Sequence, residues 1–287
     1  MSKEIKNNTS PEKPPSSPFQ ALTTRLISAA ILGTLTLYFS YLSFESFVAI
    51  CILAGALMVW EWGKLTNNDS ALAVIIPGFA IGISIIAIMT HEIPLLISTL
   101  CAAVFLSLWA THYWWRAKWA ILGLLYIGLP LLSLIYLRQD EDYGFYAIAY
   151  IFLIVWGTDT AAYFVGSTVG GKKLAPHISP NKTWSGSFGG LFAAFIISLM
   201  FSLSLAINPI ILAFVGVCLS AISQIGDLSE SAVKRHFGVK DSGALIPGHG
   251  GLLDRLDGVI FASIAAGLIA LSRASETPGK ALLIWTP

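Results

Sequence analysis

The chain alternates long apolar blocks with short polar segments, and the length of these blocks limits the folds open to it. Each block holds about 20 residues, the number that an α-helix needs to cross a hydrocarbon core roughly 30 Å thick. Since 55% of the 287 residues are hydrophobic and only 11% are charged, we predict an all-α integral membrane protein with about nine transmembrane helices. The predicted helices are 26–44, 46–62, 71–89, 93–113, 119–137, 144–166, 187–206, 209–226 and 253–272.

The first 25 residues differ from the rest, because they are rich in Pro, Ser, Asn and Lys. Such a composition cannot bury enough apolar surface to offset the loss of chain entropy, so residues 1–25 are predicted to be a disordered tail. The remaining chain divides into N-terminal transmembrane helices at 26–140 and a C-terminal transmembrane catalytic region at 141–287.

The basic residues are distributed unequally between the predicted loops. With a cytoplasmic N-terminus, 14 Lys and Arg fall on the cytoplasmic side and only three, Arg138, Arg273 and Lys280, fall on the other. Cytoplasmic loops of membrane proteins carry such an excess. We therefore predict a cytoplasmic N-terminus, with the two largest internal loops, 167–186 and 227–252, on the cytoplasmic side.

Acidic residues gather at the ends of two predicted helices. If the eighth helix continues through 227–235, Asp227, Glu230, Ser231 and Lys234 share one face, and Asp254 and Asp257 share a face on the first turns of the ninth helix. Two such helix ends can converge on one site. Carboxylate oxygens suit Mg²⁺, which takes its remaining ligands from water and substrate phosphate.

Basic and glycine residues surround these acids and suit phosphate. Lys234, Arg235, Lys240 and Arg255 can meet phosphate oxygens, and the amides of Gly248, Gly250 and Gly251 can cradle them. Taken singly, each of these residues has an ordinary explanation as a helix cap, a turn or an interfacial anchor, and His249 alone is more often structural than catalytic. The whole cluster of acids near the bilayer calls for a common reason.

An acid also lies inside a predicted helix. Asp159 and Tyr163 form an i, i+4 pair in the otherwise apolar block 144–166. An intramembrane acid is a candidate functional residue by default, with burial against a basic partner as the alternative.

The stretch "SAVKRHFGVKDSGALIPGHGGLLDRLD", residues 231–257, resembles the complete signature of the phosphatidate cytidylyltransferases, also called CDP-diacylglycerol synthases. The resemblance extends upstream through "WGTDTAAYFVG" and "KLAPHISPNKTWSG" and covers roughly residues 150–272. It implies a reaction in which the phosphate of phosphatidate attacks the α-phosphorus of CTP, giving CDP-diacylglycerol and pyrophosphate. The resemblance implies a role in phospholipid biosynthesis for a multi-pass protein of the bacterial inner membrane.

The resemblance also implies roles for individual residues. Asp227 and Asp254 are the first choice as ligands of Mg²⁺, by analogy with the family's dinuclear metal site, and a second cation is left open. Asp257 and Glu230 are second choices, since either can instead hold a lysine or arginine. The expected catalytic residues are Asp227, Lys234, Asp254, Arg255 and Asp257. The expected substrate-binding residues are Lys182 as the triphosphate contact, Ser179, Asn181, Thr183, Lys172, Lys173, Asp159, Tyr163, Arg235, Lys240, His249, Gly250 and Gly251.

Two other functions compete with this one. A CTP-dependent polyprenol or lipid kinase would use similar machinery but release CDP instead of pyrophosphate. A transporter would also explain intramembrane acids, but it should show repeated halves, and none is visible. The expected partners are CTP, phosphatidate and membrane lipid, with no nucleic acid, and a homodimer is left open.

Overall fold

The structure is a computed structural model that describes residues 33–66, 71–111, 114–205, 207–243, 245, 250–273 and 276–285. Helices dominate it, and the stretch 33–42 is also helical. The elements are α2 (Phe44–Leu65), α3 (Ala71–Met89), α4 (Ile93–Thr111), α5 (Trp114–Arg138), α6 (Gly144–Thr168), β1 (Lys173–Ala175), β2 (Ser179–Thr183), α7 (Trp184–Leu205), α8 (Pro209–His236), α9 (Leu253–Ser272) and α10 (Pro278–Leu283).

The predicted helices are confirmed wherever the structure describes them. Eight helices of the described residues are long and apolar enough to cross a membrane. Part of the first predicted helix, 26–44, and the whole predicted tail, 1–25, lie outside the described residues. The main differences are at helix ends: α8 continues ten residues beyond the predicted 226, to His236, because its polar last turns pack against α9.

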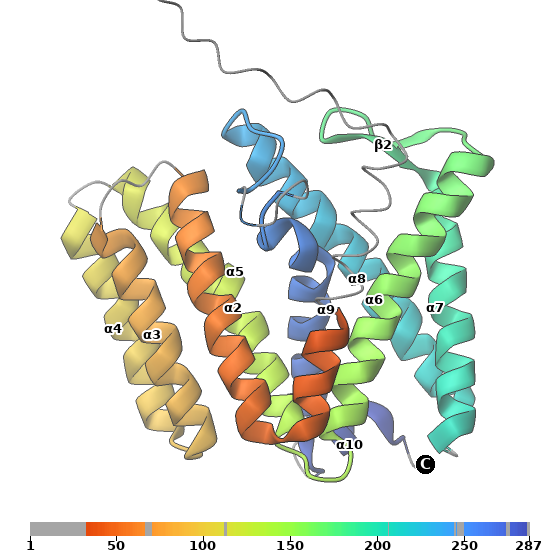
Figure 1. The fold of residues 1–287 in the computed structure, drawn as a ribbon, viewed down its shortest axis with the longest axis horizontal. Coiled ribbons are helices and arrows are strands. Elements are labelled where there is room, and N and C mark those ends of the chain that lie inside the picture. Colours follow the sequence, from red (N-terminus) through yellow and green to blue (C-terminus); the bar gives the residue numbers. More distant parts are fainter. Residues whose placement is uncertain are drawn as a thin grey trace, which may run out of the picture.

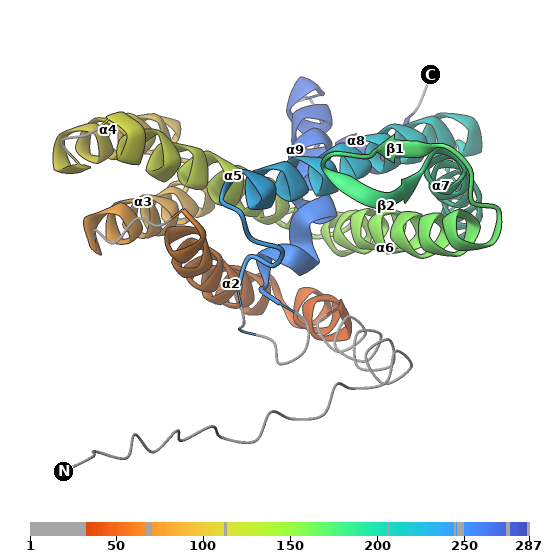
Figure 2. The ribbon, with the colours of Figure 1, turned by 90° about the horizontal axis from the view of Figure 1, so that it is seen from above.

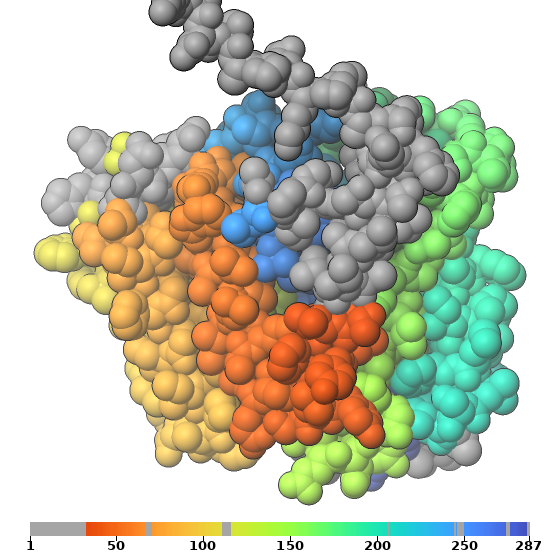
Figure 3. All heavy atoms as spheres, viewed as in Figure 1, coloured from red at the N-terminus to blue at the C-terminus, as the bar shows by residue number. Residues whose placement is uncertain are grey.

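The helices form two groups joined by α9. In Figures 1 and 2, α2 to α5 lie on one side and α6 to α8 on the other, with α9 between them. Within the groups, α6 packs against α7, α7 against α8, and α3 against α4, while α9 packs against both α5 and α8. Figure 3 shows residues 33–66 in the middle of one face, between α3 and α6. The C-terminal helices are therefore braced by the N-terminal ones through α5 and α9.

Local sequence explains where several helices begin. Ser43 caps α2 in a capping box with Ser46, with a distance of 3.1 Å for each of the two hydrogen bonds. Asn208 caps α8 and Pro209 fills its first turn, where a missing N–H costs nothing. Glycine lets α6 and α7 approach closely, because a Cβ at Gly186 would lie 2.6 Å from the carbonyl oxygen of Ala162.

Two small elements were not predicted. An antiparallel hairpin of β1 and β2 pairs Lys173 with Thr183 and Ala175 with Ser179, and Figure 2 shows it lying over the ends of α7 and α8. At the opposite end of the helices, α10 packs against α9 and α6. Both elements are too short for a hydrophobic period to reveal them.

The two ends of the bundle differ in charge. The end that carries the hairpin and the loop between α8 and α9 is called here the cation-rich end, since Lys64, Arg116, Lys172, Lys234 and Arg255 all belong to it. The opposite end holds Arg138, Arg273 and Lys280. This distribution follows the predicted split of basic residues between loops.

Candidate functional site

The last turns of α8 and the first turn of α9 meet through one lysine. Lys234 Nζ lies 2.6 Å from Glu230 Oε2, one turn earlier on α8, and 2.6 Å from Asp254 Oδ1 on α9. All three side chains are largely buried, with relative exposures of 12%, 2% and 7%. The predicted convergence of the two acid-bearing helix ends is confirmed, and Glu230 holds a lysine, the alternative that its position left open.

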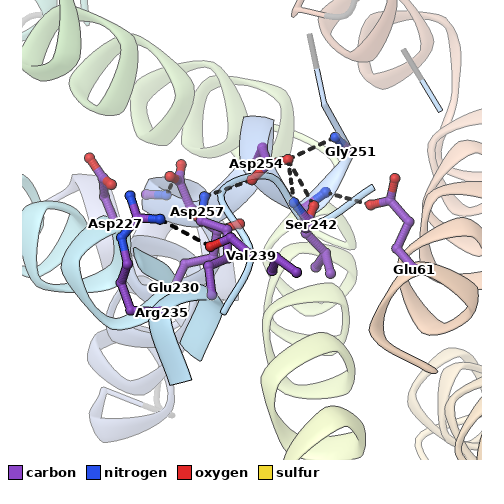
Figure 4. A network of polar contacts seen from close by, with 12 residues as sticks. Glu61, Asp227, Glu230, Arg235, Val239, Ser242, Gly251, Asp254 and Asp257 are labelled. Atoms are coloured by element: carbon purple, nitrogen blue, oxygen red, sulfur yellow. Dashed lines mark hydrogen bonds and ion pairs between the residues drawn. The ribbon is translucent and has the colours of Figure 1, made fainter. Parts of the chain in front are cut away.

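The other oxygen of Asp254 is occupied by the loop that precedes α9. Asp254 Oδ2 accepts hydrogen bonds from Ser242 N at 2.8 Å, Ser242 Oγ at 2.9 Å and Gly251 N at 2.7 Å. Figure 4 shows Asp254 between this loop and the acids of α8. Its carboxylate thus holds the glycine-rich loop against α9. The amide of Gly251, which was expected to bind phosphate, instead donates to Asp254.

Asp227 has a different partner. It forms an ion pair with Lys182 of β2, and the two side chains keep 28% and 26% of their surface exposed. The following residue, Thr183, caps α7, because its Oγ1 accepts a hydrogen bond from Gly186 N at 3.1 Å. The start of α7 therefore fixes the end of β2, and β2 carries Lys182 to α8.

Two cavities open beside these residues. The first, called here the polar cavity, has a volume of about 510 Å³ and is lined by Asp159, Ala162, Tyr163, Gly166, Ser167, Lys173, Leu174, Asn181, Lys182, Thr183, Gly186, Ser187, Gln224 and Asp227. It lies between α6, α7, α8 and the hairpin.

The second, called here the apolar-walled cavity, has a volume of about 490 Å³ and lies against an earlier part of α6, at Phe152, Trp156, Asp159 and Thr160. Its apolar wall comes from 33–36, α2 and α6, with Leu53, Leu57 and Trp156 among the side chains. Asp254, Arg255 and Asp257 from the first turns of α9 also line it. Asp159 and Asp227 line both cavities, so the two spaces adjoin at these acids.

The sequence model of the Cytidylyltransferase family matches residues 23–271 of the chain. The chain belongs to this family. It is similar to proteins named phosphatidate cytidylyltransferase in two groups of bacteria. With that of Brucella suis biovar 1 (strain 1330) it shares 43% identity over 248 residues, 84% of this chain and 90% of the relative. With that of Staphylococcus aureus (strain COL) it shares 38% identity over 228 residues, 75% of this chain and 86% of the relative.

In this cytidylyltransferase, many predicted site residues line the two cavities. These are Tyr163, Lys173, Asn181, Lys182 and Thr183 in the polar cavity, Asp254, Arg255 and Asp257 in the apolar-walled cavity, and Asp159 and Asp227 in both. These spaces explain why an acid occurs within this apolar helix, because Asp159 lies where the linings of the two cavities meet along α6.

Other predicted residues lie outside the lining of both cavities. These are Lys172, Ser179, Glu230, Lys234, Arg235, Lys240, Gly250 and Gly251, while His249 lies outside the described residues. Arg235 Nη1 donates to the carbonyl oxygen of Val239 at 3.0 Å, so it braces the turn after α8. Lys172 contributes its carbonyl oxygen, which accepts from Trp184 N at 3.0 Å.

Two polar residues that shape the site, Ser242 and Glu61, were not predicted from the sequence. Ser242 holds Asp254 with both its amide and its hydroxyl. Glu61 of α2 is fully buried and accepts hydrogen bonds from Leu252 N and Leu253 N. The rule that selected Asp159, an acid within an apolar run, also applies to Glu61, but the flanking tryptophans of "WEWGK" resemble an interfacial belt.

The acids of this site suit a hard divalent cation in chemistry, although no group of three or more His, Cys, Asp or Glu in the described part of the chain is arranged to hold a metal ion. Asp159 and Asp227 face both cavities, and Asp257 faces one. Asp257 Oδ1 accepts one hydrogen bond, from Gly258 N at 2.8 Å. Carboxylates that reach open space in this way can complete their coordination with water and phosphate oxygens.

Proposed function

We propose that the protein is a phosphatidate cytidylyltransferase, which joins the phosphate of phosphatidate to the cytidylyl group of CTP and releases pyrophosphate. The observation that carries the proposal is the meeting of a polar cavity and an apolar-walled cavity at Asp159 and Asp227. A lipid substrate and a soluble nucleotide need such a junction. The acyl chains of the lipid require apolar surroundings and the nucleotide requires polar ones, but the two reacting phosphates must meet. Membership of the cytidylyltransferase family and the similarity to bacterial phosphatidate cytidylyltransferases support it.

The polar cavity is suited to the nucleotide. Lys182 and Lys173 bring positive charge to it, and Asn181 and Gln224 offer amide groups that can donate and accept hydrogen bonds. Lys182 would exchange its partner Asp227 for a phosphate oxygen of CTP, a charge-assisted contact of similar strength. We therefore keep Lys182 as the triphosphate contact.

The apolar-walled cavity is suited to phosphatidate. Acyl chains can lie against Leu53, Leu57 and Trp156, while Arg255 stands at the acidic end of the same cavity and can bind the lipid phosphate. A phosphatidate placed in this way would present a phosphate oxygen toward the junction with the polar cavity.

The proposed chemistry relies on positioning rather than on a protein nucleophile. An oxygen of the phosphatidate phosphate attacks the α-phosphorus of CTP, and the bond from that phosphorus to the β-phosphate bridging oxygen breaks. Both reactants are already anionic, so the protein has to bring them together and offset their repulsion. Lys173 and Lys182 in the polar cavity and Arg255 in the apolar-walled cavity are the basic residues that can offset this repulsion.

We propose Mg²⁺ as the cofactor, held by Asp227 together with an acid of α9. When bound, the ion would neutralise phosphate charge and orient the phosphates of both substrates. The contacts favour Asp257 as the α9 ligand, since Asp254 already accepts from Lys234, Ser242 and Gly251. Asp159 lines the same junction and is a further candidate ligand.

A cytoplasmic location of the cation-rich end and residence in a bacterial inner membrane belong to the same proposal. The excess of Lys and Arg at that end and the bacterial source of the relatives support them. This orientation would give CTP access to the polar cavity from the cytoplasm.

The direct test uses purified protein with phosphatidate, Mg²⁺ and CTP radiolabelled at the α-phosphate. The proposal expects label in CDP-diacylglycerol, release of pyrophosphate and loss of turnover when Mg²⁺ is chelated. Label in free CDP, with γ-phosphate transferred to a lipid alcohol, would instead identify a CTP-dependent lipid kinase. No reaction of phosphatidate in the presence of CTP and Mg²⁺ would contradict the proposal.

A further inference from the structure

Glu61 connects the N-terminal helices to the first turn of α9. It lies in the last third of α2, has no exposed surface, and stands 191 positions before Leu252 in sequence. Its Oε1 accepts from Leu252 N at 2.9 Å and its Oε2 accepts from Leu253 N at 3.0 Å. None of the ion pairs among the described residues includes Glu61. Main-chain amides of α9 are thus the groups that compensate its buried carboxylate.

The first turn of α9 needs an acceptor from elsewhere. A helix leaves its first N–H groups without partners, and a Ser, Thr, Asp or Asn at the N-cap usually satisfies one of them. The N-cap of α9 is Leu252, whose side chain makes no capping hydrogen bond. Glu61 supplies this acceptor, and its negative charge is favoured at the positive end of the helix.

The loop before α9 is built to let Glu61 approach. A Cβ at Gly243 would lie 2.7 Å from Glu61 Oε1, and a Cβ at Gly251 would lie 2.6 Å from both carboxylate oxygens. Any side chain at either position would therefore press on the carboxylate. The three successive amides of 251–253 divide between two acids: the first donates to Asp254 and the next two donate to Glu61, as Figure 4 shows around Asp254 and Glu61.

We propose that Glu61 is a positioning residue: it fixes the first turn of α9, and with it the directions in which Asp254, Arg255 and Asp257 enter the apolar-walled cavity. The proposal rests on the proposed function for its kinetic consequences. It assigns to α2 a part in the site that a purely supporting helix would not have.

The primary test is Glu61→Gln. Glutamine has nearly the same shape, but it presents an NH₂ group to one of the two amides and removes the charge. We expect kcat to fall by about 10- to 100-fold, the scale of a small misplacement of reacting groups. The KM for CTP should change little, because the polar cavity does not include α9. The backbone amides of 251–255 should exchange hydrogen faster in the same variant.

Two matched variants separate positioning from simple stabilisation. Glu45→Gln makes the same substitution in the first turn of α2, at an exposed residue, and should leave both kcat and exchange at 251–255 unchanged. Asp140→Asn removes charge from a buried carboxylate that accepts backbone hydrogen bonds at the opposite end of the bundle. It should lower Tm but leave kcat unchanged at temperatures well below Tm.

A second disruption of the contact covers the case in which Glu61→Gln does not fold. Gly243→Ala adds one methyl group that must displace the Glu61 carboxylate or the loop, so it should lower kcat and speed exchange at 251–255 to a smaller extent. Folded variants with wild-type kcat, or with exchange at 251–255 unchanged, would overturn the positioning role. Failure of the wild-type protein to make CDP-diacylglycerol would count against the proposed function alone, because the exchange measurement needs no substrate.

Discussion

Asp140 and Asp227 are both acids near helix ends, but at opposite ends of the bundle they are used in opposite ways. Asp140, which is 5% exposed, accepts from Asp142 N and Tyr143 N with one oxygen, and from Thr277 Oγ1 and Lys280 N with the other. Asp227 makes an ion pair with Lys182 and faces two cavities.

The basic residues at the two ends differ in the same way. At the end opposite to the site, Arg138 donates to the carbonyl oxygen of Ser40 at 2.8 Å, and Arg273 donates to the carbonyl oxygen of Ile284 at 2.9 Å. At the cation-rich end, Lys182 and Arg255 line cavities. A charge whose partners are main-chain groups of its own fold stabilises that fold, whereas a charge that lines a cavity can also contact a molecule bound there.

The Glu230–Lys234–Asp254 group sharpens this comparison, because it is a structural ion-pair group inside the site. Lys234→Ala would leave two buried carboxylates without their cation, at a cost of about 3–5 kcal/mol in the free energy of unfolding. We expect a large fall in Tm of the protein in detergent. A control, Lys240→Ala, changes an exposed lysine of the loop that follows α8 and should leave Tm unchanged. A Lys234→Ala protein of normal Tm would show that the group does not hold α8 to α9.

The comparison predicts that Asp227→Asn and Asp140→Asn have opposite consequences. Asp227→Asn should lower turnover by about 10²- to 10³-fold, the effect of removing one preorganised electrostatic contact, with Tm close to that of the wild type. Asp140→Asn should lower Tm and keep turnover. Turnover and Tm should be measured for both variants. An Asp227→Asn protein with a lowered Tm and normal turnover would contradict the proposed difference between the two acids.

The two acids of α9 can be distinguished by their dependence on Mg²⁺. Asp257→Asn should raise the Mg²⁺ concentration that gives half-maximal turnover by about 10-fold or more, while Tm is retained. Asp254→Asn should lower Tm, since it disturbs the bonds to Lys234, Ser242 and Gly251. The reverse pattern would make Asp254 the metal ligand that the sequence analysis placed first.

The opposite end also predicts a dependence of stability on pH. Burial raises the pKa of Asp140, but the hydrogen bonds from Thr277, Tyr143, Lys280 and Asp142 outweigh burial and lower the pKa overall. A carboxyl group with a lowered pKa makes its full contribution to stability when the pH is above its pKa in the unfolded chain, about 3.9. This contribution is lost as the pH falls through the pKa of the folded state. The difference in Tm between wild type and Asp140→Asn should therefore be constant from pH 7 to about pH 5 and shrink below pH 4. A difference that stayed constant at pH 3 would contradict the assignment.

The sequence predicted the parts of this molecule that repeat a simple pattern. Apolar blocks located the helices, and the spacing of Asp227, Glu230 and Lys234 placed them on one face of a helix that the structure extends to His236. Contacts between distant segments were not predictable in this way. Nothing local to "WEWGK" indicates that Glu61 will reach Leu252, and Ser242 is an ordinary loop residue until the loop folds back on Asp254.

The different roles of the acids within the site could be assigned only once their contacts and the cavities were known. From sequence alone, Asp254 and Asp227 are equivalent acids at helix ends. Only the three-dimensional contacts distinguish a carboxylate taken up by a loop from one that faces open space. The role of the short hairpin also depends on three-dimensional contacts. Thr183 caps α7, and Lys182, the residue before it, pairs with Asp227.

The central claim is that separate cavities for CTP and phosphatidate adjoin at Asp159 and Asp227, and one crossed kinetic measurement tests it most directly. Lys182→Ala removes charge from the polar cavity, whereas Leu53→Trp adds bulk to the wall of the apolar-walled cavity. Ile52→Trp, an exposed position on α2 outside both linings, is the control. Lys182→Ala should raise the KM for CTP by about 10- to 100-fold with little change for phosphatidate, and Leu53→Trp should raise the KM for phosphatidate by about 10-fold with little change for CTP. If each variant altered both KM values equally, or if Leu53→Trp behaved like Ile52→Trp, the two-cavity account would be contradicted.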